Sequence, residues 1–313
     1  MILDIVILIV ALGALVKGAD YIIDEAEKLA VHYSIPSFVI GATVIALGTS
    51  LPEMVASMFA SYQGHSELAV SNVIGSNIFN LALVLGLVFI IGKKLTPKRD
   101  IFKEDSAWAL FPILTFLLIA YNNEISRFDG MIYIMMMVGY LVFLKNNALD
   151  ILEGEGTNKN KEKFNFKSTT LFMLLGFTFV LVGAHFTVES ASSIATTLGV
   201  SEWVIGLLVI AFGTSLPELA VSITAIKKGD ADMAIGNIIG SNIANFTVVI
   251  GASALISPLA IDLGKSMFDI MAALILTIML VFVTVNKLYN RSTGIVFLLI
   301  FFLVVEHSLT LPH

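Results

Sequence analysis

The chain has 313 residues, of which 57% are hydrophobic and only 13% are charged. Soluble globular domains carry about 25% charged residues, so this composition excludes a soluble protein and indicates an integral membrane protein. The formal net charge is −6, and we expect no nucleic-acid partner. The absence of cysteine excludes disulfides, thiolate metal sites and cysteine nucleophiles.

Ten apolar segments are long enough to cross the ~30 Å hydrocarbon core of a bilayer, which takes roughly 20 helical residues. They cover residues 2–23, 36–61, 67–91, 105–121, 129–146, 168–190, 201–226, 231–257, 266–285 and 292–309. Backbone polar groups in lipid must pair internally, so each segment is expected to be a helix or a broken helix packed against protein. The first segment lacks a basic start and a cleavage signature, and we expect it to be retained as a span.

Basic residues are distributed unevenly among the loops. Fifteen Lys and Arg follow the odd-numbered spans, whereas only Arg127 and Lys265 follow the even-numbered ones. The positive-inside rule then places the odd-numbered loops in the cytoplasm and both termini outside the cell. The longest loop, residues 147–167, is charged and rich in Gly and Asn, and we expect a flexible linker. It separates two predicted five-helix halves, residues 1–146 and 168–313.

One motif occurs twice. Residues 41–57 read GATVIALGTSLPEMVAS and are followed by NVIGSNIFN at 72–80, while residues 206–222 read GLLVIAFGTSLPELAVS and are followed by NIIGSNIAN at 237–245. Equivalent positions are 165 residues apart throughout (218 − 53, 241 − 76, 245 − 80). Because five spans per half is an odd number, the second half must enter the membrane from the opposite side. The sequence therefore predicts an inverted-topology repeat in the cell membrane, the architecture on which many secondary transporters build alternating access.

The polar side chains of both motifs fall at one depth in the membrane. With a helix rise of about 1.5 Å per residue, the middles of the four motif spans lie near Thr49, Asn80, Thr214 and Ile243. Residues spaced i, i+4 share a helix face, and the motifs contain four such pairs: Thr49–Glu53, Ser76–Asn80, Thr214–Glu218 and Ser241–Asn245. Intramembrane carboxylates are costly and mark ion or substrate pathways, so we expect these groups to converge on one cavity.

Each motif also contains a proline within its span, Pro52 and Pro217. A helix-interior proline frees the carbonyl four residues earlier, here Gly48 and Gly213, and a free carbonyl in the membrane needs another partner. A metal cation would serve. Carboxylate, hydroxyl, amide and carbonyl oxygens together form a ligand set suited to Ca²⁺ or Na⁺ and poorly suited to a soft metal.

The duplicated GTSLPE and GSNIxN sequences resemble the α-repeats of the cation/Ca²⁺ exchanger superfamily, and most closely its prokaryotic sodium/calcium exchangers. The resemblance covers essentially the whole chain. It implies a ten-helix antiporter for Na⁺ and Ca²⁺ in which Glu53 and Glu218 are shared central ligands. It also implies Ca²⁺ ligands from Thr49 and Thr214, Na⁺ sites formed by the Ala46 carbonyl with Ser76 and by the Ala211 carbonyl with Ser241, and a lining of Ser50, Ser215, Asn80 and Asn245.

One position departs from part of the family. Several members, including potassium-dependent ones, carry an aspartate where this chain has Asn245, and asparagine is present here in both halves. We therefore expect exchange that does not require K⁺. The resemblance also implies more than two Na⁺ per Ca²⁺, and hence electrogenic transport. We expect the first and sixth spans, which lie outside the motif core, to slide over a fixed site during the transport cycle.

Other functions remain open at this point. A proton/calcium exchanger or a potassium-dependent exchanger would use the same fold, and a passive cation channel is a further alternative. Two buried carboxylates can also do acid/base work, but the chain has no recognisable aspartyl-protease motif, and we expect neither enzymatic activity nor a cofactor. Ser76, Ser241, Asn80 and Asn245 could instead serve interhelical packing. The expected partners are Ca²⁺, Na⁺ and membrane lipid, with no obligatory protein partner.

Overall fold

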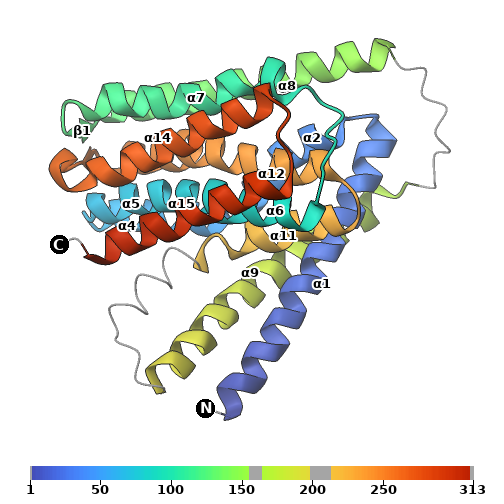
Figure 1. Cartoon of the computed structure of the whole chain (residues 1–313), viewed down its shortest axis with the longest axis horizontal. Helices are drawn as coiled ribbons and strands as arrows, with labels where there is room; N and C mark the ends of the chain where they lie inside the picture. Colours follow the sequence, from blue (N-terminus) through green and yellow to red (C-terminus); the bar gives the residue numbers. More distant parts are fainter. Residues whose placement is uncertain (1, 155–163, 198–212, 311–313) are drawn as a thin grey trace.

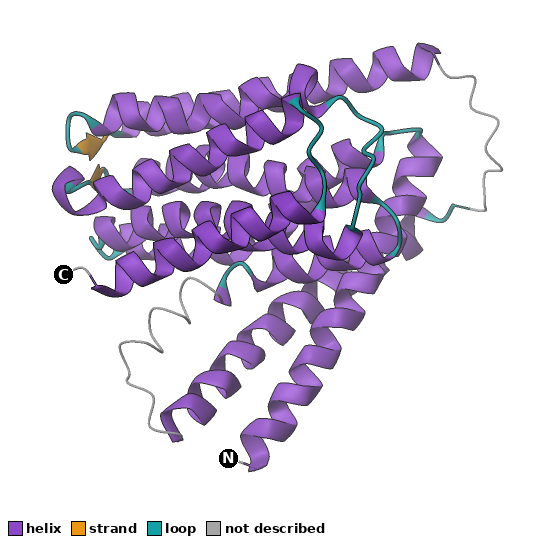
Figure 2. Ribbon diagram, viewed as in Figure 1, coloured by secondary structure: helices purple, strands orange, loops and turns teal. Residues whose placement is uncertain are grey.

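The computed structural model describes residues 2–154, 164–197 and 213–310. In the first half the helices are α1 Ile2–Tyr33, α2 Ser37–Ile40, the π-helix η1 Gly41–Ile45, α3 Ala46–Thr49, α4 Leu51–Tyr62, α5 Ser66–Phe79, the π-helix η2 Asn80–Val84, α6 Leu85–Gly92, α7 Ile101–Ala120 and α8 Arg127–Gly154. The second half contains α9 Phe166–Thr197, α11 Leu216–Lys227, α12 Ala231–Ala244, the π-helix η3 Asn245–Val249, α13 Ile250–Ile256, α14 Leu263–Val285 and α15 Arg291–Thr310. Two short strands, β1 Glu124–Ile125 and β2 Leu259–Ala260, pair antiparallel. The fold is therefore helical almost throughout (Figure 2).

Six uninterrupted spans among the described residues are long and apolar enough to cross a membrane. They are Leu3–Tyr33, Ser66–Gly92, Arg127–Asn147, Phe166–Ser190, Ala231–Ile256 and Ser266–Val285. A seventh results if the bent pair Ser37–Thr49 and Leu51–Tyr62 is one span. Two further predicted spans coincide with α7 and α15, and the one at 201–226 is described only from residue 213. The chain is thus a multi-pass membrane protein, while the total of ten spans and the side on which the termini lie stay predictions.

The two halves are built in the same register. α4 and α11, α5 and α12, and η2 and η3 begin at positions that differ by 165 (216 − 51, 231 − 66, 245 − 80). The sequence analysis expected helices or broken helices, and it did not anticipate the three π-helical segments. A π turn widens the helix by one residue and is frequent at functional sites, and here one begins at Asn80 and another at Asn245.

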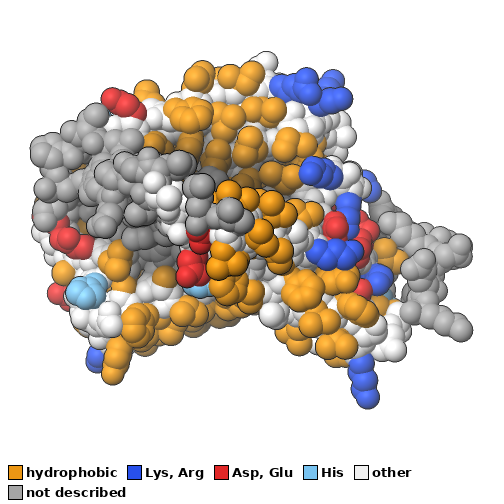
Figure 3. All heavy atoms as spheres, turned by 90° about the horizontal axis from the view of Figure 1, so that it is seen from below, with side chains coloured by type: hydrophobic (Ala, Val, Ile, Leu, Met, Phe, Trp, Pro, Cys, Tyr) orange, Lys and Arg blue, Asp and Glu red, His pale blue; other side chains and the backbone are white. Residues whose placement is uncertain are grey.

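The motif helices form the centre of the bundle. In the most apolar part of each span, 72% of the residues in Ser66–Gly92 and 78% in Ala231–Ile256 are buried, compared with 28% in α1 and 33% in α9. Figure 1 shows α1 and α9 leaving the bundle obliquely, side by side. On the face shown in Figure 3, hydrophobic side chains cover broad areas and most of the visible Lys and Arg lie toward one end. Such an apolar exterior suits contact with lipid.

Glycines bring α1 and α9 into close contact. A Cβ added at Gly18 would lie 2.7 Å from the carbonyl oxygen of Gly176, and one added at Gly183 would lie 2.8 Å from the carbonyl oxygen of Ala11. These contacts pair earlier residues of α1 with later residues of α9, so the helices run antiparallel. Backbone-to-backbone packing through small residues is a common way to join membrane helices, and it makes α1 and α9 one packed pair.

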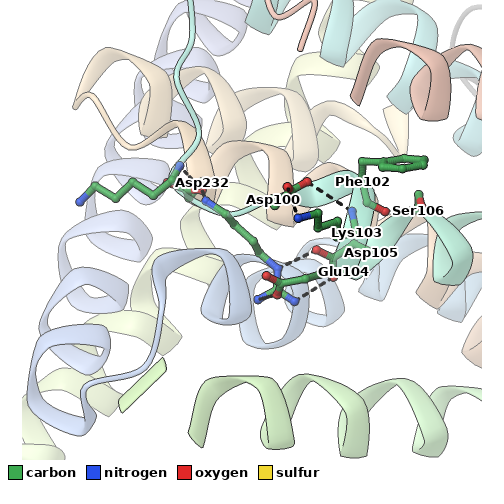
Figure 4. A network of polar contacts seen from close by, with 9 residues as sticks. Asp100, Phe102, Lys103, Glu104, Asp105, Ser106 and Asp232 are labelled. Atoms are coloured by element: carbon green, nitrogen blue, oxygen red, sulfur yellow. Dashed lines mark hydrogen bonds and ion pairs between the residues drawn. The ribbon is translucent and has the colours of Figure 1, made fainter. Parts of the chain in front are cut away.

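A polar network fixes the loop between α6 and α7 (Figure 4). Asp232 near the start of α12 accepts hydrogen bonds from the backbone N–H groups of Lys98 and Arg99. The buried Arg99 guanidinium pairs with Asp105 at 2.6 Å and with Glu104 at 2.7 Å. The ion pairs thus hold the loop against the start of α7, and the backbone hydrogen bonds to Asp232 connect it to the second half.

The predicted linker is shorter than expected. α8 continues to Gly154 and α9 begins at Phe166, so both ends of the segment 147–167 are helical and its predicted boundaries were wrong. A helix satisfies its own backbone hydrogen bonds and can continue beyond the hydrocarbon region, where polar side chains meet water. Residues 155–163 lie outside the described part of the chain.

Candidate cation-binding site

In both motifs a helix begins at the Leu-Pro pair, directly after a serine with non-helical backbone angles. Ser50, with φ −79° and ψ 8°, separates α3 from α4, and the helices on its two sides are bent by 46°. Ser215, with φ −92° and ψ 3°, lies in the same position before α11. Because Pro52 and Pro217 have no backbone N–H, they fit the first turn of a helix better than its interior. The prolines thus lie in the first turns of α4 and α11 and not in a helix interior as expected, and the residues before 213 in the second motif lie outside the described part of the chain.

The breaks place both carboxylates at helix starts. Glu53 and Glu218 lie in the first turns of α4 and α11, where the positive end of the helix dipole favours a negative group. Both side chains are fully buried. The helix starts therefore stabilise two charges that apolar surroundings alone would not tolerate.

A reciprocal pair of hydrogen bonds joins the two halves at these carboxylates. Ser50 Oγ donates to Glu218 Oε1 at 3.1 Å, and Ser215 Oγ donates to Glu53 Oε1 at 3.4 Å. Each serine stands three residues before the glutamate of its own half and contacts the glutamate of the other. The two predicted central ligands thus belong to one polar cluster built from both repeats.

Ser76 of α5 extends this cluster. Its hydroxyl donates to Glu53 Oε1 at 3.5 Å and lies 3.4 Å from the hydroxyl oxygen of Thr214. The contact with Glu53 stays within the first half, whereas the contact with Thr214 crosses to the second. Ser76 therefore contacts site residues of both repeats.

The corresponding groups on the other side come together as well. Ser241 Oγ lies 3.5 Å from Thr49 Oγ1 and donates to the Ala46 carbonyl at 3.5 Å. Thr49 donates to the same carbonyl at 3.3 Å. The oxygens of Thr49, Ser241 and Ala46 therefore lie within hydrogen-bond distance of one another. Ala211, the equivalent of Ala46, lies outside the described residues.

Two asparagines that the sequence analysis did not assign hold Asn80 and Asn245. Asn80 Nδ2 donates to Asn242 Oδ1 at 3.1 Å, and Asn245 Nδ2 donates to Asn77 Oδ1 at 3.3 Å. With its nitrogen bound to the opposite repeat, each amide has its oxygen left for another partner. Asn77 and Asn242 are the N of GSN in both motifs, and this repetition was the signal that could have identified them.

Four buried oxygens of the candidate site accept no hydrogen bond within the described part of the chain. They are Glu53 Oε2, Glu218 Oε2, Asn80 Oδ1 and Asn245 Oδ1. Leaving a buried acceptor unpaired costs about 1–3 kcal/mol, and more for a charged group. These unpaired oxygens occupy equivalent positions, two in each repeat, and they are of the kind that Ca²⁺ prefers as ligands.

Eleven of the twelve predicted site residues lie in the described ranges. Ten of them are buried and Thr214 is partly exposed. Within those ranges no group of three or more His, Cys, Asp or Glu side chains could hold a metal ion. A cation bound here would therefore rely on two carboxylates and on neutral oxygens, as the sequence predicts.

Comparisons with known proteins agree with the motif resemblance. The family model described as sodium/calcium exchanger protein matches residues 3–145 and 168–310. The sodium/calcium exchanger MaX1 of Methanosarcina acetivorans is 31% identical, with 96% of this chain and 98% of MaX1 covered. The inner membrane protein YrbG of Escherichia coli is 36% identical over 84% of this chain and 82% of its own length.

A solved structure gives the same result. The sodium-calcium exchanger NCX_Mj, soaked with zero Na⁺ and Ca²⁺, superimposes with a TM-score of 0.84 at 32% identity, covering 98% of this chain and 99% of NCX_Mj. Sequence and fold thus agree over both halves, which confirms the resemblance read from the duplicated motif. The chain therefore belongs to the sodium/calcium exchanger protein family, whose members carry out cation/Ca²⁺ exchange.

Proposed function

We propose that this protein is a secondary active antiporter that exchanges Na⁺ for Ca²⁺ across the cell membrane by alternating access. The observation that carries the proposal is the set of four buried oxygens without a donor in the described ranges. The printed names of two similar proteins, MaX1 and NCX_Mj, support the choice of ions. The proposed ligands are the twelve residues predicted from the sequence.

The charge of the site sets the proposed stoichiometry. One Ca²⁺ neutralises Glu53 and Glu218, as do two Na⁺, and any further Na⁺ leaves the loaded site positive. Exchange of more than two Na⁺ for one Ca²⁺ then moves net charge across the membrane. Asn80 and Asn245 add oxygen ligands without a third carboxylate, which supports exchange that does not require K⁺.

The same two charges make exchange obligatory. An empty site would carry two buried carboxylates, and each unneutralised charge near the bilayer centre costs about 2.5–3.5 kcal/mol even on lenient insertion scales. The unloaded protein should therefore seldom change the side to which its site is open. This distinguishes an exchanger from a passive channel, which would conduct one ion without a counter-ion.

The packed pair α1–α9 is the proposed moving element. Both of its helices are much less buried than the motif helices. α9 lies over both motifs, because the Phe177 ring is against Gly48 and Val188 is against Gly213. If this pair slides, Phe177 and Val188 move away from Gly48 and Gly213, while Glu53 and Glu218 stay in place. The glycine contacts between α1 and α9 support their movement as one body.

Ca²⁺ uptake into proteoliposomes under separate Na⁺, K⁺ and H⁺ gradients tests the proposal. We expect uptake that is driven by an outward Na⁺ gradient and unchanged when K⁺ is replaced by choline. Uptake should be faster when the vesicle interior is made positive, because more than two Na⁺ leave for each Ca²⁺ that enters. Uptake driven by a pH gradient without Na⁺ would favour the proton/calcium exchanger. A strict K⁺ requirement would favour the potassium-dependent alternative.

A further inference from the structure

Asn237 lies at the contact between α12 and the helix break of the opposite half, and none of the predicted ligand roles includes it. Its side chain is fully buried. Its Oδ1 accepts a hydrogen bond from the Thr49 hydroxyl at 3.3 Å, across 188 positions of sequence. Thr49 is the last residue of α3, so this contact holds the end of the helix directly before the break.

A serine fixes the orientation of the Asn237 amide. Asn237 Nδ2 donates to Ser222 Oγ of α11 at 3.0 Å, and a nitrogen held on that side leaves the carbonyl facing Thr49. Without such a partner the amide could rotate and present its N–H₂ group to the Thr49 hydroxyl, because the two ends of an Asn side chain are nearly equal in size.

The first half contains the same Asn–Ser pair, which supports this assignment of the amide. Asn72 Nδ2 donates to Ser57 Oγ at 2.8 Å, and both pairs are 15 residues apart. Ser57 donates its own single hydrogen to the Ala69 carbonyl at 3.2 Å. Ser57 can therefore only accept from Asn72, and the asparagine must turn its nitrogen toward the serine.

The Thr49 hydroxyl has one hydrogen and three possible acceptors within reach, which are the Asn237 and Ala46 carbonyls at 3.3 Å and the Ser241 hydroxyl oxygen at 3.5 Å. The Ala46 carbonyl already accepts the Ser50 N–H at 3.0 Å. If this carbonyl ligates a cation, as the proposed function requires, the cation and the Ser50 N–H occupy its two lone pairs, and it becomes a poor acceptor for the Thr49 hydrogen. The Ser241 oxygen, also a proposed cation ligand, is a poor acceptor for the same reason. The Asn237 carbonyl is then the acceptor that keeps the hydrogen away from the cation and the oxygen lone pairs of Thr49 available.

We propose that Asn237 is a positioning residue for cation binding, which holds Thr49 through its hydroxyl and is itself oriented by Ser222. The proposal rests on the proposed function, because it gives Thr49 a place at the transported cation. Asn237 does not contact the cation in this scheme. Its contribution passes through Thr49, and this makes it testable by a double-mutant cycle.

The cycle compares Asn237→Ala, Thr49→Val and the double variant in Na⁺-driven Ca²⁺ uptake, with KM for Ca²⁺ and the maximal rate measured separately. We expect Asn237→Ala to raise KM about tenfold, the effect of losing one buried hydrogen bond, with the maximal rate within about twofold. In the Thr49→Val background the same substitution should raise KM by less than about twofold. Asn72→Ala is the matched control, and its effect should multiply with that of Thr49→Val.

Each result decides between the two claims. If the effects of Asn237→Ala and Thr49→Val multiply, or if Thr49→Val leaves KM unchanged, the positioning role is wrong while the exchanger function stands. If Glu53→Gln and Glu218→Gln leave uptake intact, the proposed function itself fails. Should Asn237→Ala not yield a monodisperse protein by size-exclusion chromatography, Asn237→Leu preserves the side-chain volume and is measured in the same cycle.

Discussion

Ser50 donates a hydrogen bond to Glu218 at 3.1 Å, although the two residues are 168 positions apart. The contact places the helix break of one repeat on the carboxylate of the other. It also means that neither repeat forms the candidate site alone. Removal of the serine hydroxyl at one break should therefore remove a hydrogen bond from the carboxylate of the opposite half and weaken its binding of Ca²⁺.

Ser50→Ala should weaken apparent Ca²⁺ affinity roughly 10- to 100-fold, because a hydrogen bond to a charged group contributes about 1.5–3 kcal/mol. Ser215→Ala should act in the same direction through Glu53. KM for Ca²⁺ in proteoliposome uptake measures both. Ser71→Ala is the control, since the exposed Ser71 hydroxyl contacts only a carbonyl of its own helix among the described contacts. Equal KM values for Ser50→Ala and Ser71→Ala would contradict the contact.

A crosslink between α1 and the turn after α11 should stop transport if the α1–α9 pair slides. Lys228 Nζ lies 2.7 Å from Asp24 Oδ1 and 3.5 Å from Asp20 Oδ1, so thiols introduced by Asp24→Cys and Lys228→Cys are separated by about the length of a lysine side chain and can be joined by a short bifunctional methanethiosulfonate, which forms a disulfide with each thiol. The chain contains no other cysteine. The crosslinker should block uptake and a reductant should restore it, while each single variant transports under both conditions. Uptake at the full rate by fully crosslinked protein would exclude sliding at this contact.

Gly183→Ala should destabilise the α1–α9 pair. The added Cβ would lie 2.8 Å from the Ala11 carbonyl oxygen, a backbone atom that cannot rotate away, and overpacking of this kind costs about 1–3 kcal/mol. Gly13→Ala in α1 is the matched control, because its Cβ would meet no atom within 4 Å. Thermal unfolding in detergent should show a lower Tm for Gly183→Ala alone. Indistinguishable Tm values would show that the helices do not pack as closely as described.

Arg99→Met should lower stability by about 3–5 kcal/mol, because it leaves the buried Asp105 carboxylate without its partner. Chemical unfolding in detergent measures the loss. Replacing Asp105 by Leu in the same protein should recover part of it, since removal of both charges leaves no unpaired ion. Lys103→Met tests for a general charge effect, as the Lys103 side chain is 78% exposed and should matter little. A double variant less stable than Arg99→Met would contradict the pairing.

Residues whose effect is local were predictable from the sequence. Pro52 and Pro217 identify the helix breaks because proline lacks an N–H wherever it occurs. The constant offset of 165 predicted that Glu53 and Glu218, and likewise Ser76 and Ser241, lie at the same depth, since equal spacing in two related halves gives equal depth. The family follows from the same duplication.

Features that depend on contacts between distant helices were not predictable. The π turns at Asn80 and Asn245 have no composition signal. The repeated GSN marks Asn77 and Asn242, but their partners Asn245 and Asn80 are known only from the contacts between α5 and α12. The sequence analysis counted Arg99 among the loop cations, because nothing in the sequence shows that its side chain is buried and paired with Asp105. The end of α8 was missed because polar residues beyond the membrane are equally compatible with helix and loop.

The central claim is that Glu53 and Glu218 form one cation site shared by the two repeats. Calorimetric titration of Ca²⁺ into the purified protein, with Glu53→Gln and Glu218→Gln measured in parallel, tests this claim most directly. The account predicts that either substitution alone abolishes Ca²⁺ binding, because one site loses one of its two carboxylates. Binding that persists in each variant at half the stoichiometry of the unaltered protein would show two independent sites and contradict it.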